Sequence, residues 1–193
     1  MDLETKAERK PRADAQRNRE RLAEAAKAAF AEAGADVSLE EIARRAGVGI
    51  GTFYRHFPNR DSIVEAVYRR EVSQLADSAT RLAATLSPAE ALRQWMRLFV
   101  DYIATKKLLA SSLAAIVGGT GELYAASWPR ITGAMSRLVE AAKAAGEIRA
   151  DADPGDLLRA LAGFTYGAAN PDWQASALRL IDILMDGLKP PRS

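Results

Sequence analysis

SLEEIARRAGVGIGTFYRHF, which runs from Ser38 to Phe57, is the stretch that decides the fold of this chain. It opens with Ser38 and Glu41, an S-x-x-E pattern in which each side chain binds a free backbone N–H at a helix start. Gly47 follows about two turns later, and glycine readily ends a helix in the left-handed conformation. A second short helix is expected from about Ile50 to His56. Two helices joined by a turn that contains glycine predict a helix-turn-helix, whose second helix enters the DNA major groove.

The charge of this stretch favours contact with phosphate. No Asp or Glu occurs from Ile42 to Arg60, whereas the whole chain has 27 Lys and Arg against 25 Asp and Glu. The local excess comes from Arg44, Arg45, Arg55 and Arg60, joined by the only histidine, His56. An acid-free basic segment is the electrostatic footprint of DNA binding. A solvated helix face has the same composition, but the capping pattern, the glycine turn and the hydroxyls of Thr52 and Tyr54 favour DNA.

The segment IARRAGVGIGTFYRHFPNRDSI resembles the signature of the TetR family of bacterial transcriptional regulators, and the likeness covers about Leu22 to Tyr68. The resemblance implies phosphate contacts from Thr52, Tyr54 and Arg60. Gly49 stands where the family usually has serine, and Ile50 where polar residues are common, so an apolar contact such as one with a thymine methyl is expected. The full predicted DNA-binding set is Ser38, Arg44, Gly49, Ile50, Gly51, Thr52, Tyr54, Arg55, His56 and Arg60.

Length and composition limit the alternatives. The chain has 193 residues, 48% of them hydrophobic, which is enough for one large domain or two small ones. The absence of Cys excludes disulfides and fits a reducing compartment. The charged N-terminus lacks the apolar core of a signal peptide, and the longest uncharged run, from Leu108 to Gly121, is too short to span a bilayer. We therefore expect a cytoplasmic protein with no membrane partner.

The sequence predicts no enzyme, no cofactor and no metal site. His56 lies in the expected recognition helix, and no Ser-His-Asp set, phosphate-binding loop or metal-ligand spacing is present. Acidic residues are abundant, but they occur on charged helix faces where solvated surface is their ordinary role.

Helical periodicity continues through the rest of the chain, with no alternating strand pattern, so the predicted fold class is all-α. Residues 1–14 are charged and poor in apolar side chains, which predicts a disordered basic arm that either solubilises the protein or reaches DNA. A helix from about Ala15 to Ala33 completes a three-helix DNA-binding head over residues 15–58. Residues 59–193 are expected to form a larger helical domain for effector binding and dimerisation. The cations of the arm are Lys6, Arg9, Lys10 and Arg12.

Start and stop signals place the helices of the larger domain. Asn59 caps a helix from about Arg60 to Leu82, and Ser87-Pro88-Ala89-Glu90 opens the next one. The remaining expected helices run from about Leu108 to Val117, from Glu122 to Ala145 with an interruption or kink at Pro129, and onward from Asp153-Pro154 and Asn170-Pro171.

The middle of the chain holds most of the large aromatic and Met side chains. Core packing explains any one of them, but together they predict an apolar cavity between helices, where the resemblance places a small-molecule effector. The uncharged run from Leu108 to Gly121 is a candidate wall. Because clustered acids, His and Cys are lacking, an apolar or aromatic organic effector is expected. The predicted ligand residues are Trp95, Met96, Phe99, Tyr102, Ser112, Tyr124, Trp128 and Met135.

The last two helices are apolar on more than one face, and such a helix must be buried on two sides. One side can be the protein's own core, and the other predicts a homodimer built as a four-helix bundle. The alternative is that both faces are buried within one chain. The predicted dimerisation residues are Leu157, Leu161, Gly163, Phe164, Gly167, Leu178, Ile181 and Met185.

These features predict a homodimeric repressor that binds a palindromic operator in double-stranded DNA and is released by a small, mainly apolar organic ligand. Its two half-sites are expected about one DNA turn apart, roughly 34–36 Å. The alternative is a helical ligand-binding protein with weak or non-specific DNA binding, which Gly49 and Ile50 favour.

Overall fold

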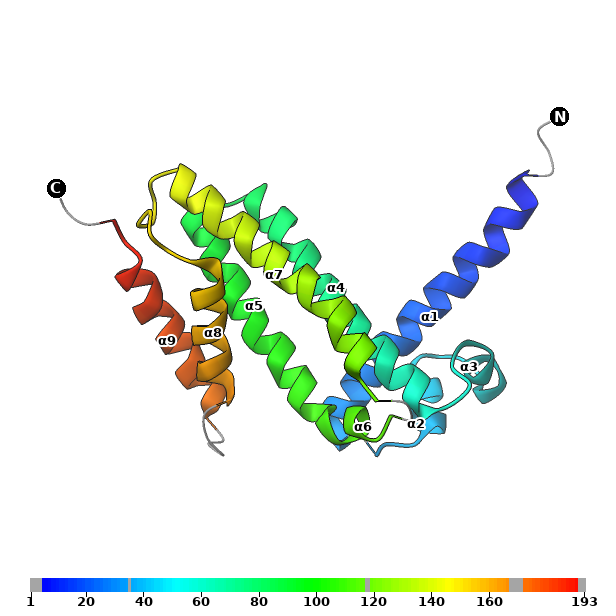
Figure 1. Ribbon diagram of the computed structural model, residues 1–193. Helices are drawn as coiled ribbons and strands as arrows, with labels where there is room; N and C mark the ends of the chain where they lie inside the picture. Colours follow the sequence, from blue (N-terminus) through cyan, green and yellow to red (C-terminus); the bar gives the residue numbers. More distant parts are fainter. Residues whose placement is uncertain (1–4, 35, 117–118, 167–171, 191–193) are drawn as a thin grey trace. The chain divides into compact units, whose positions relative to one another are not determined.

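The computed structural model describes residues 5–34, 36–116, 119–166 and 172–190, and over these ranges every regular element is a helix (Figure 1). The predicted all-α fold class is confirmed. The helices are α1 (Thr5–Ala33), α2 (Leu39–Arg45), α3 (Ile50–His56), α4 (Arg60–Ala83), α5 (Pro88–Leu108), α6 (Ala110–Ala114), α7 (Gly121–Ala144), α8 (Pro154–Tyr166) and α9 (Trp173–Gly187).

The chain divides into two compact units. The head unit consists of Met1–Arg70 and Leu108–Thr120, and the larger unit consists of Glu71–Lys107 and Gly121–Ser193. This division differs from the expected boundary after residue 58, because Pro58 ends a helix without ending the packing that continues into α4. It also places the segment 108–120, expected as a wall of the effector cavity, in the head unit.

The head unit is built on α1, with α2 and α3 packed on its C-terminal half (Figure 1). Apolar side chains at helical spacing on α1 meet one fully buried residue from each of the other two helices. These buried residues are Leu22, Ala26 and Phe30 from α1, Ile42 from α2 and Phe53 from α3. The core therefore fixes α3 through its inner face and leaves the other face accessible.

Helix α1 begins at Thr5, about ten residues before the expected start at Ala15. Residues 1–4 lie outside the described ranges, and the expected disordered basic arm over residues 1–14 stays a prediction. This segment lacks apolar side chains, but most of its residues are good helix formers such as Ala, Glu, Lys and Arg. Contact between this arm and DNA stays a prediction.

Three predicted helix caps are confirmed. The Oγ of Ser38 accepts a hydrogen bond from the backbone N–H of Glu41 at 3.1 Å. The Oδ1 of Asn59 accepts from Ser62 N–H at 2.9 Å, and the Oδ1 of Asp153 accepts from Asp156 N–H at 2.8 Å. Helix α7 is continuous across Pro129. Asp172 holds the N-cap position of α9, whereas the predicted start at Asn170-Pro171 lies outside the described residues.

Gly47 turns the chain between α2 and α3 with a φ of +66°. An added Cβ would lie 3.1 Å from the Nη2 of Arg21, which itself donates a 2.6 Å hydrogen bond to Ala46 O. Replacing Gly47 with alanine is expected to destabilise the head by about 1–2 kcal/mol, because left-handed backbone is costly for any residue with a Cβ. Urea unfolding of Gly47→Ala measures this loss. Gly133→Ala in α7 is the control, where an added Cβ comes no closer than 3.5 Å to the Nη1 of Arg137. Equal stability of Gly47→Ala and the parent protein would contradict the expectation.

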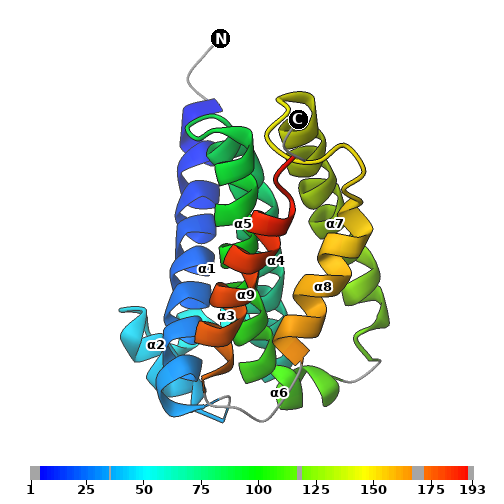
Figure 2. The same cartoon turned by 90° about the vertical axis from the view of Figure 1, so that its left-hand side faces the viewer.

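The larger unit has a core centred on α5. The buried side chains of α5 include Leu92, Trp95, Met96, Phe99 and Val100, and the Nε1 of Trp95 donates to Leu75 O in α4 at 2.9 Å. Helix α8 packs on α7 and also on α9, so that these helices lie side by side (Figure 2).

Ion pairs hold α9 against α5. Asp182 of α9 accepts hydrogen bonds from Arg93 at 2.7 Å and from Arg97 at 3.0 Å. The hydrogen bond from Arg97, followed by the contact with Arg93, lowers the pKa of Asp182. One face of α9 is therefore committed to the protein's own fold.

Candidate nucleic-acid interface and effector pocket

One face of α3 is open to solvent. Ile50, Gly51, Tyr54 and Arg55 are exposed, and they share a face because they lie at positions i, i+1, i+4 and i+5 of a helix. Phe53 on the opposite face is fully buried, whereas Tyr54 is 46% exposed. The side chains expected to meet the groove are thus displayed by a helix whose inner face is fixed by packing.

Two arginines of α1 that sequence reasoning missed fix the position of α3. The guanidinium of Arg19 lies 4.6 Å from the centre of the Phe57 ring, and its Nη1 donates to His56 O at 3.2 Å. Arg21 holds the preceding turn through its bond to Ala46 O. Both precede the buried Leu22 within one helical turn, but sequence spacing alone does not show which polar residues of α1 turn toward α3.

The arginines of α2 are paired with acids. Glu41 accepts hydrogen bonds from Arg44 Nη2 and from Arg45 Nε, both at 2.7 Å, and Arg45 Nη1 also lies 2.6 Å from the Oε2 of Glu32. The bonds from Arg44 and then Arg45 lower the pKa of Glu41 to about 2, so its carboxyl is ionised at neutral pH. Glu41 immediately precedes the acid-free stretch, and its single negative charge is shared by two of the arginines that make that stretch basic.

The other predicted DNA-binding residues occupy varied environments. Arg60 is half-buried and donates to Val37 O at 2.6 Å, which ties the start of α4 to the loop before α2. The Oγ of Ser38 acts as acceptor in the N-cap, so its hydroxyl hydrogen can still be donated to a phosphate. Gly49 is exposed, while Thr52 and His56 are half-buried. Their roles on DNA remain predictions.

Neutralising Glu41 is expected to strengthen binding to random DNA. In Glu41→Gln, Arg44 and Arg45 lose their shared carboxylate and become available to phosphates. We expect binding to random duplex DNA at low salt to tighten severalfold, and the salt slope of log K to steepen by about one. Fluorescence anisotropy across a salt series measures both quantities.

Glu40→Gln supplies the matched control, because Glu40 is an exposed acid on the same turn and its loss changes the net charge equally. If the two variants gained equal affinity, net charge alone would account for the effect and the pairing with Glu41 would have no role.

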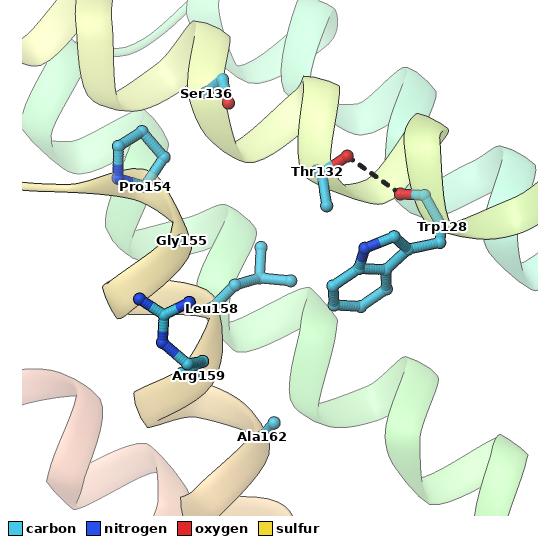
Figure 3. Close-up of a pocket in the computed structure, with 8 residues that line it drawn as sticks. All are labelled: Trp128, Thr132, Ser136, Pro154, Gly155, Leu158, Arg159 and Ala162. Atoms are coloured by element: carbon cyan, nitrogen blue, oxygen red, sulfur yellow. Dashed lines mark hydrogen bonds between the residues drawn. The ribbon is translucent and has the colours of Figure 1, made fainter.

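A cavity of about 320 Å³ lies between α7 and α8 in the larger unit (Figure 3). Trp128, Thr132 and Ser136 contribute from α7, where a spacing of four residues places them on one face. The lining from α8 consists of Pro154, Gly155, Leu158, Arg159 and Ala162. Trp128 belongs to the predicted ligand set, and it is 56% exposed.

The other predicted ligand residues lie elsewhere. Trp95, Met96, Phe99, Tyr102 and Met135 are buried, and the rings of Trp95 and Phe99 lie 6.0 Å apart as part of the core. Tyr124 is half-buried beneath Lys106, whose Nζ is 4.6 Å from the ring centre. Ser112 belongs to α6 in the head unit.

Of the predicted ligand residues, Trp128 lines this cavity, and the roles of the others in binding stay predictions. The spacing of four residues between Trp128, Thr132 and Ser136 is the signal in the sequence that these side chains share one helix face. The large side chains of the predicted ligand set are mostly core residues, because large apolar residues stabilise a core most when they are buried.

The predicted dimerisation residues divide between two faces. Leu157, Leu161, Ile181 and Met185 are buried within the chain, Phe164 and Leu178 are half-buried, and Gly163 is exposed; Gly167 lies outside the described residues. The exposed apolar side chains of α9 are instead Leu180, at 36%, and Ile183, at 66%. Ile181 and Met185 lie on the same side as Ala177 and Leu188, toward the protein's own core. The exposed apolar side chains of α9 therefore lie on a different side of the helix from this buried set.

Within the described ranges, no helix is long and apolar enough to cross a membrane. Among the same residues, no three His, Asp or Glu side chains gather into a group that could hold a metal ion.

A helix-turn-helix with an exposed second helix, joined to a larger helical unit, defines the class of helix-turn-helix DNA-binding regulators. Residues 22–67 match the family model of bacterial regulatory proteins of the tetR family. Residues 87–190 match the C-terminal domain of SbtR-like transcriptional regulators, which is also a TetR-type domain. The chain belongs to the TetR family of transcriptional regulators.

Solved structures agree with this assignment over most of the chain. The TetR transcriptional regulator SCO0520 from Streptomyces coelicolor is 47% identical, with 90% of this chain and 99% of that one covered and a TM-score of 0.82. A TetR regulatory protein from Mycobacterium vanbaalenii is 37% identical, with 92% and 98% covered and a TM-score of 0.73.

Similarity to curated sequences is confined to one region. An HTH-type transcriptional regulator of Staphylococcus aureus (strain USA300) is 39% identical over 62 residues, which are 32% of this chain and 34% of that protein. The chain thus matches about a third of the length of this curated relative.

Proposed function

We propose that the protein is a homodimeric, cytoplasmic, non-catalytic repressor that reads a palindromic operator with α3 of each subunit and is released by a small, mainly apolar organic ligand. The observation that carries this proposal is the outer face of α3. There a tyrosine, an arginine and an isoleucine are displayed on a helix whose opposite side is fixed by the fully buried Phe53.

Each part of that face suits a different part of DNA. The guanidinium of Arg55 can bind guanine O6 and N7, and the exposed side chain of Ile50 suits a thymine methyl. The hydroxyls of Tyr54 and Thr52 can donate to phosphates and set the register of the helix without reading sequence. Specificity would then come mainly from Ile50 and Arg55, and affinity from the phosphate contacts.

We propose that dimerisation uses a stripe on α9 formed by Ser176, Leu180, Ile183 and Gly187. Their spacing of four, three and four residues places two apolar and two small side chains in one line along the helix. The opposite face of α9 is held to α5 through Asp182, so this stripe remains for a partner. Half-buried Phe164 and exposed Gly163 of α8 extend the surface.

Two features support coupling between effector and DNA. Helix α4 is continuous across the boundary between Arg70 and Glu71, so it belongs to both units. Lys107, the last residue before the head-unit segment 108–120, donates to Thr165 O at the end of α8 and lies 3.9 Å from the ring centre of Trp173 at the start of α9. A ligand that changes the setting of α8 would act on the contact between Lys107 and Thr165, in proportion to its different affinity for the two states.

Binding to the DNA that flanks the protein's own gene tests the proposed function. We expect saturable binding that survives an excess of random DNA and weakens steeply with salt. Equal affinity for the flanking and the random DNA would reject the repressor and favour a helical ligand-binding protein with non-specific DNA binding.

A further inference from the structure

The cavity between α7 and α8 has a size that restricts its ligand. Its volume of about 320 Å³ is near the lower end of the usual range for small-molecule sites, roughly 300–1,000 Å³. The site therefore suits a compact molecule of one or two rings.

An aromatic platform forms one wall of the cavity. Trp128 is 56% exposed, and its ring extends from α7 toward Leu158 of α8 (Figure 3). Tryptophan side chains are strong contributors at binding surfaces, because a flat ring covers a large apolar area with little loss of conformational entropy. Between Trp128 and Leu158 a planar apolar group would be covered on both sides.

The other wall carries a positive charge. Arg159 lines the cavity from α8, and its guanidinium is paired with Asp156 one turn earlier. Both side chains of this pair are at least 70% exposed, and exposed ion pairs contribute little to stability. A ligand carboxylate that binds the guanidinium through two parallel hydrogen bonds can therefore replace Asp156.

The hydroxyls of the α7 wall add directional polar groups. The Oγ1 of Thr132 donates within its own helix, to Trp128 O at 3.1 Å or Pro129 O at 3.2 Å, so toward a ligand it can only accept. Ser136 lines the cavity one turn further along the same face. Both positions suit the polar edge of a ligand more than its ring.

We propose that this cavity binds a compact aromatic carboxylate, with its ring between Trp128 and Leu158 and its carboxylate on Arg159. The inference rests on the proposed effector function, because it names the chemical class of the ligand that would release the protein from DNA.

Calorimetric titration of the full chain with 1-naphthylacetate and with its neutral amide, 1-naphthylacetamide, tests the proposal. The acid should bind at least about tenfold more tightly than the amide, because only the acid can pair with the guanidinium. Arg159→Gln should abolish this preference and leave binding of the amide unchanged. Asp156→Asn should raise affinity for the acid, since it removes the competing carboxylate.

Two further variants complete the design. Trp128→Ala should weaken acid and amide alike by about tenfold, because both use the ring. Arg149→Gln is the matched control, since Arg149 is exposed and paired with the nearby Asp151 but does not line the cavity. Circular dichroism verifies that each variant is folded.

Absence of binding by both probes at about 1 mM, equal affinity for acid and amide, or an unchanged preference in Arg159→Gln would overturn the proposal. The outcome is separate from the proposed function, because these titrations contain no DNA. If the acid bound as expected but never released operator DNA, the assigned ligand class would stand and the effector role would fail. If an effector released the DNA with equal potency from the Trp128 and Arg159 variants, the repressor would stand and the assigned cavity would fail.

Discussion

Replacing Ile183 with glutamate is expected to convert the protein to a monomer and to weaken operator binding by about 100-fold or more. Ile183 is 66% exposed in the single chain and stands at the centre of the proposed α9 stripe. A carboxylate there would be buried without a partner in the dimer, at a cost of several kcal/mol, and the two-fold axis would repeat that cost in both subunits. Analytical ultracentrifugation reports the oligomeric state, and fluorescence anisotropy reports operator affinity.

The matched control is Ala175→Glu, which introduces the same residue on the same helix at an exposed position outside the stripe. It should remain dimeric and keep its operator affinity. Since Ile183 is exposed in the chain, both variants should unfold at the same temperature as the parent protein. A dimeric Ile183→Glu would show that α9 contacts its partner through another face or does not take part in dimerisation.

Removing the hydroxyl of Tyr54 is expected to produce the largest loss of affinity from a single atom. Tyr54 is 46% exposed on the outer face of α3, and a hydrogen bond to a charged phosphate contributes about 1–3 kcal/mol. Because the dimer presents two copies, Tyr54→Phe should weaken operator binding by at least about tenfold. The loss should be similar on operator and random DNA, since phosphate contacts carry no sequence information. Anisotropy titrations on both DNAs measure it.

Tyr124→Phe makes the same chemical change in the larger unit and serves as the control, with unchanged DNA affinity expected. A loss restricted to operator DNA in Tyr54→Phe would contradict the assigned phosphate contact and would place the hydroxyl on a base edge.

The helix-turn-helix was predictable because its signals are local. The N-cap at Ser38, the left-handed Gly47 and the bounds of α3 all follow from backbone chemistry within a few residues. The same holds for the caps at Asn59 and Asp153. The basic character of the motif was less predictable, because Glu41 lies one residue outside the acid-free stretch and reaches back to Arg44 and Arg45.

The pocket and the partner surface depend on long-range packing, which sequence spacing describes only in part. Trp95 of α5 and Trp128 of α7 are the same residue type, yet Trp95 is fully buried in the core and Trp128 is 56% exposed. On α9, apolar residues cover several faces, and long-range packing buries Ile181 and Met185 while Asp182 beside them pairs with Arg93 and Arg97. That pairing joins residues more than 80 positions apart, beyond the reach of any local pattern.

Selection of DNA sites from a pool of random duplexes by the purified protein tests the central claim most directly. If two copies of α3 read DNA through Ile50 and Arg55, the selected sequences should converge on a two-fold symmetric site. Its half-sites should lie about one helical turn apart, roughly 34–36 Å, and Arg55→Ala should relax the preference at one position of each half-site. A pool that stays random after repeated rounds, or that converges on a site without two-fold symmetry, would contradict the account.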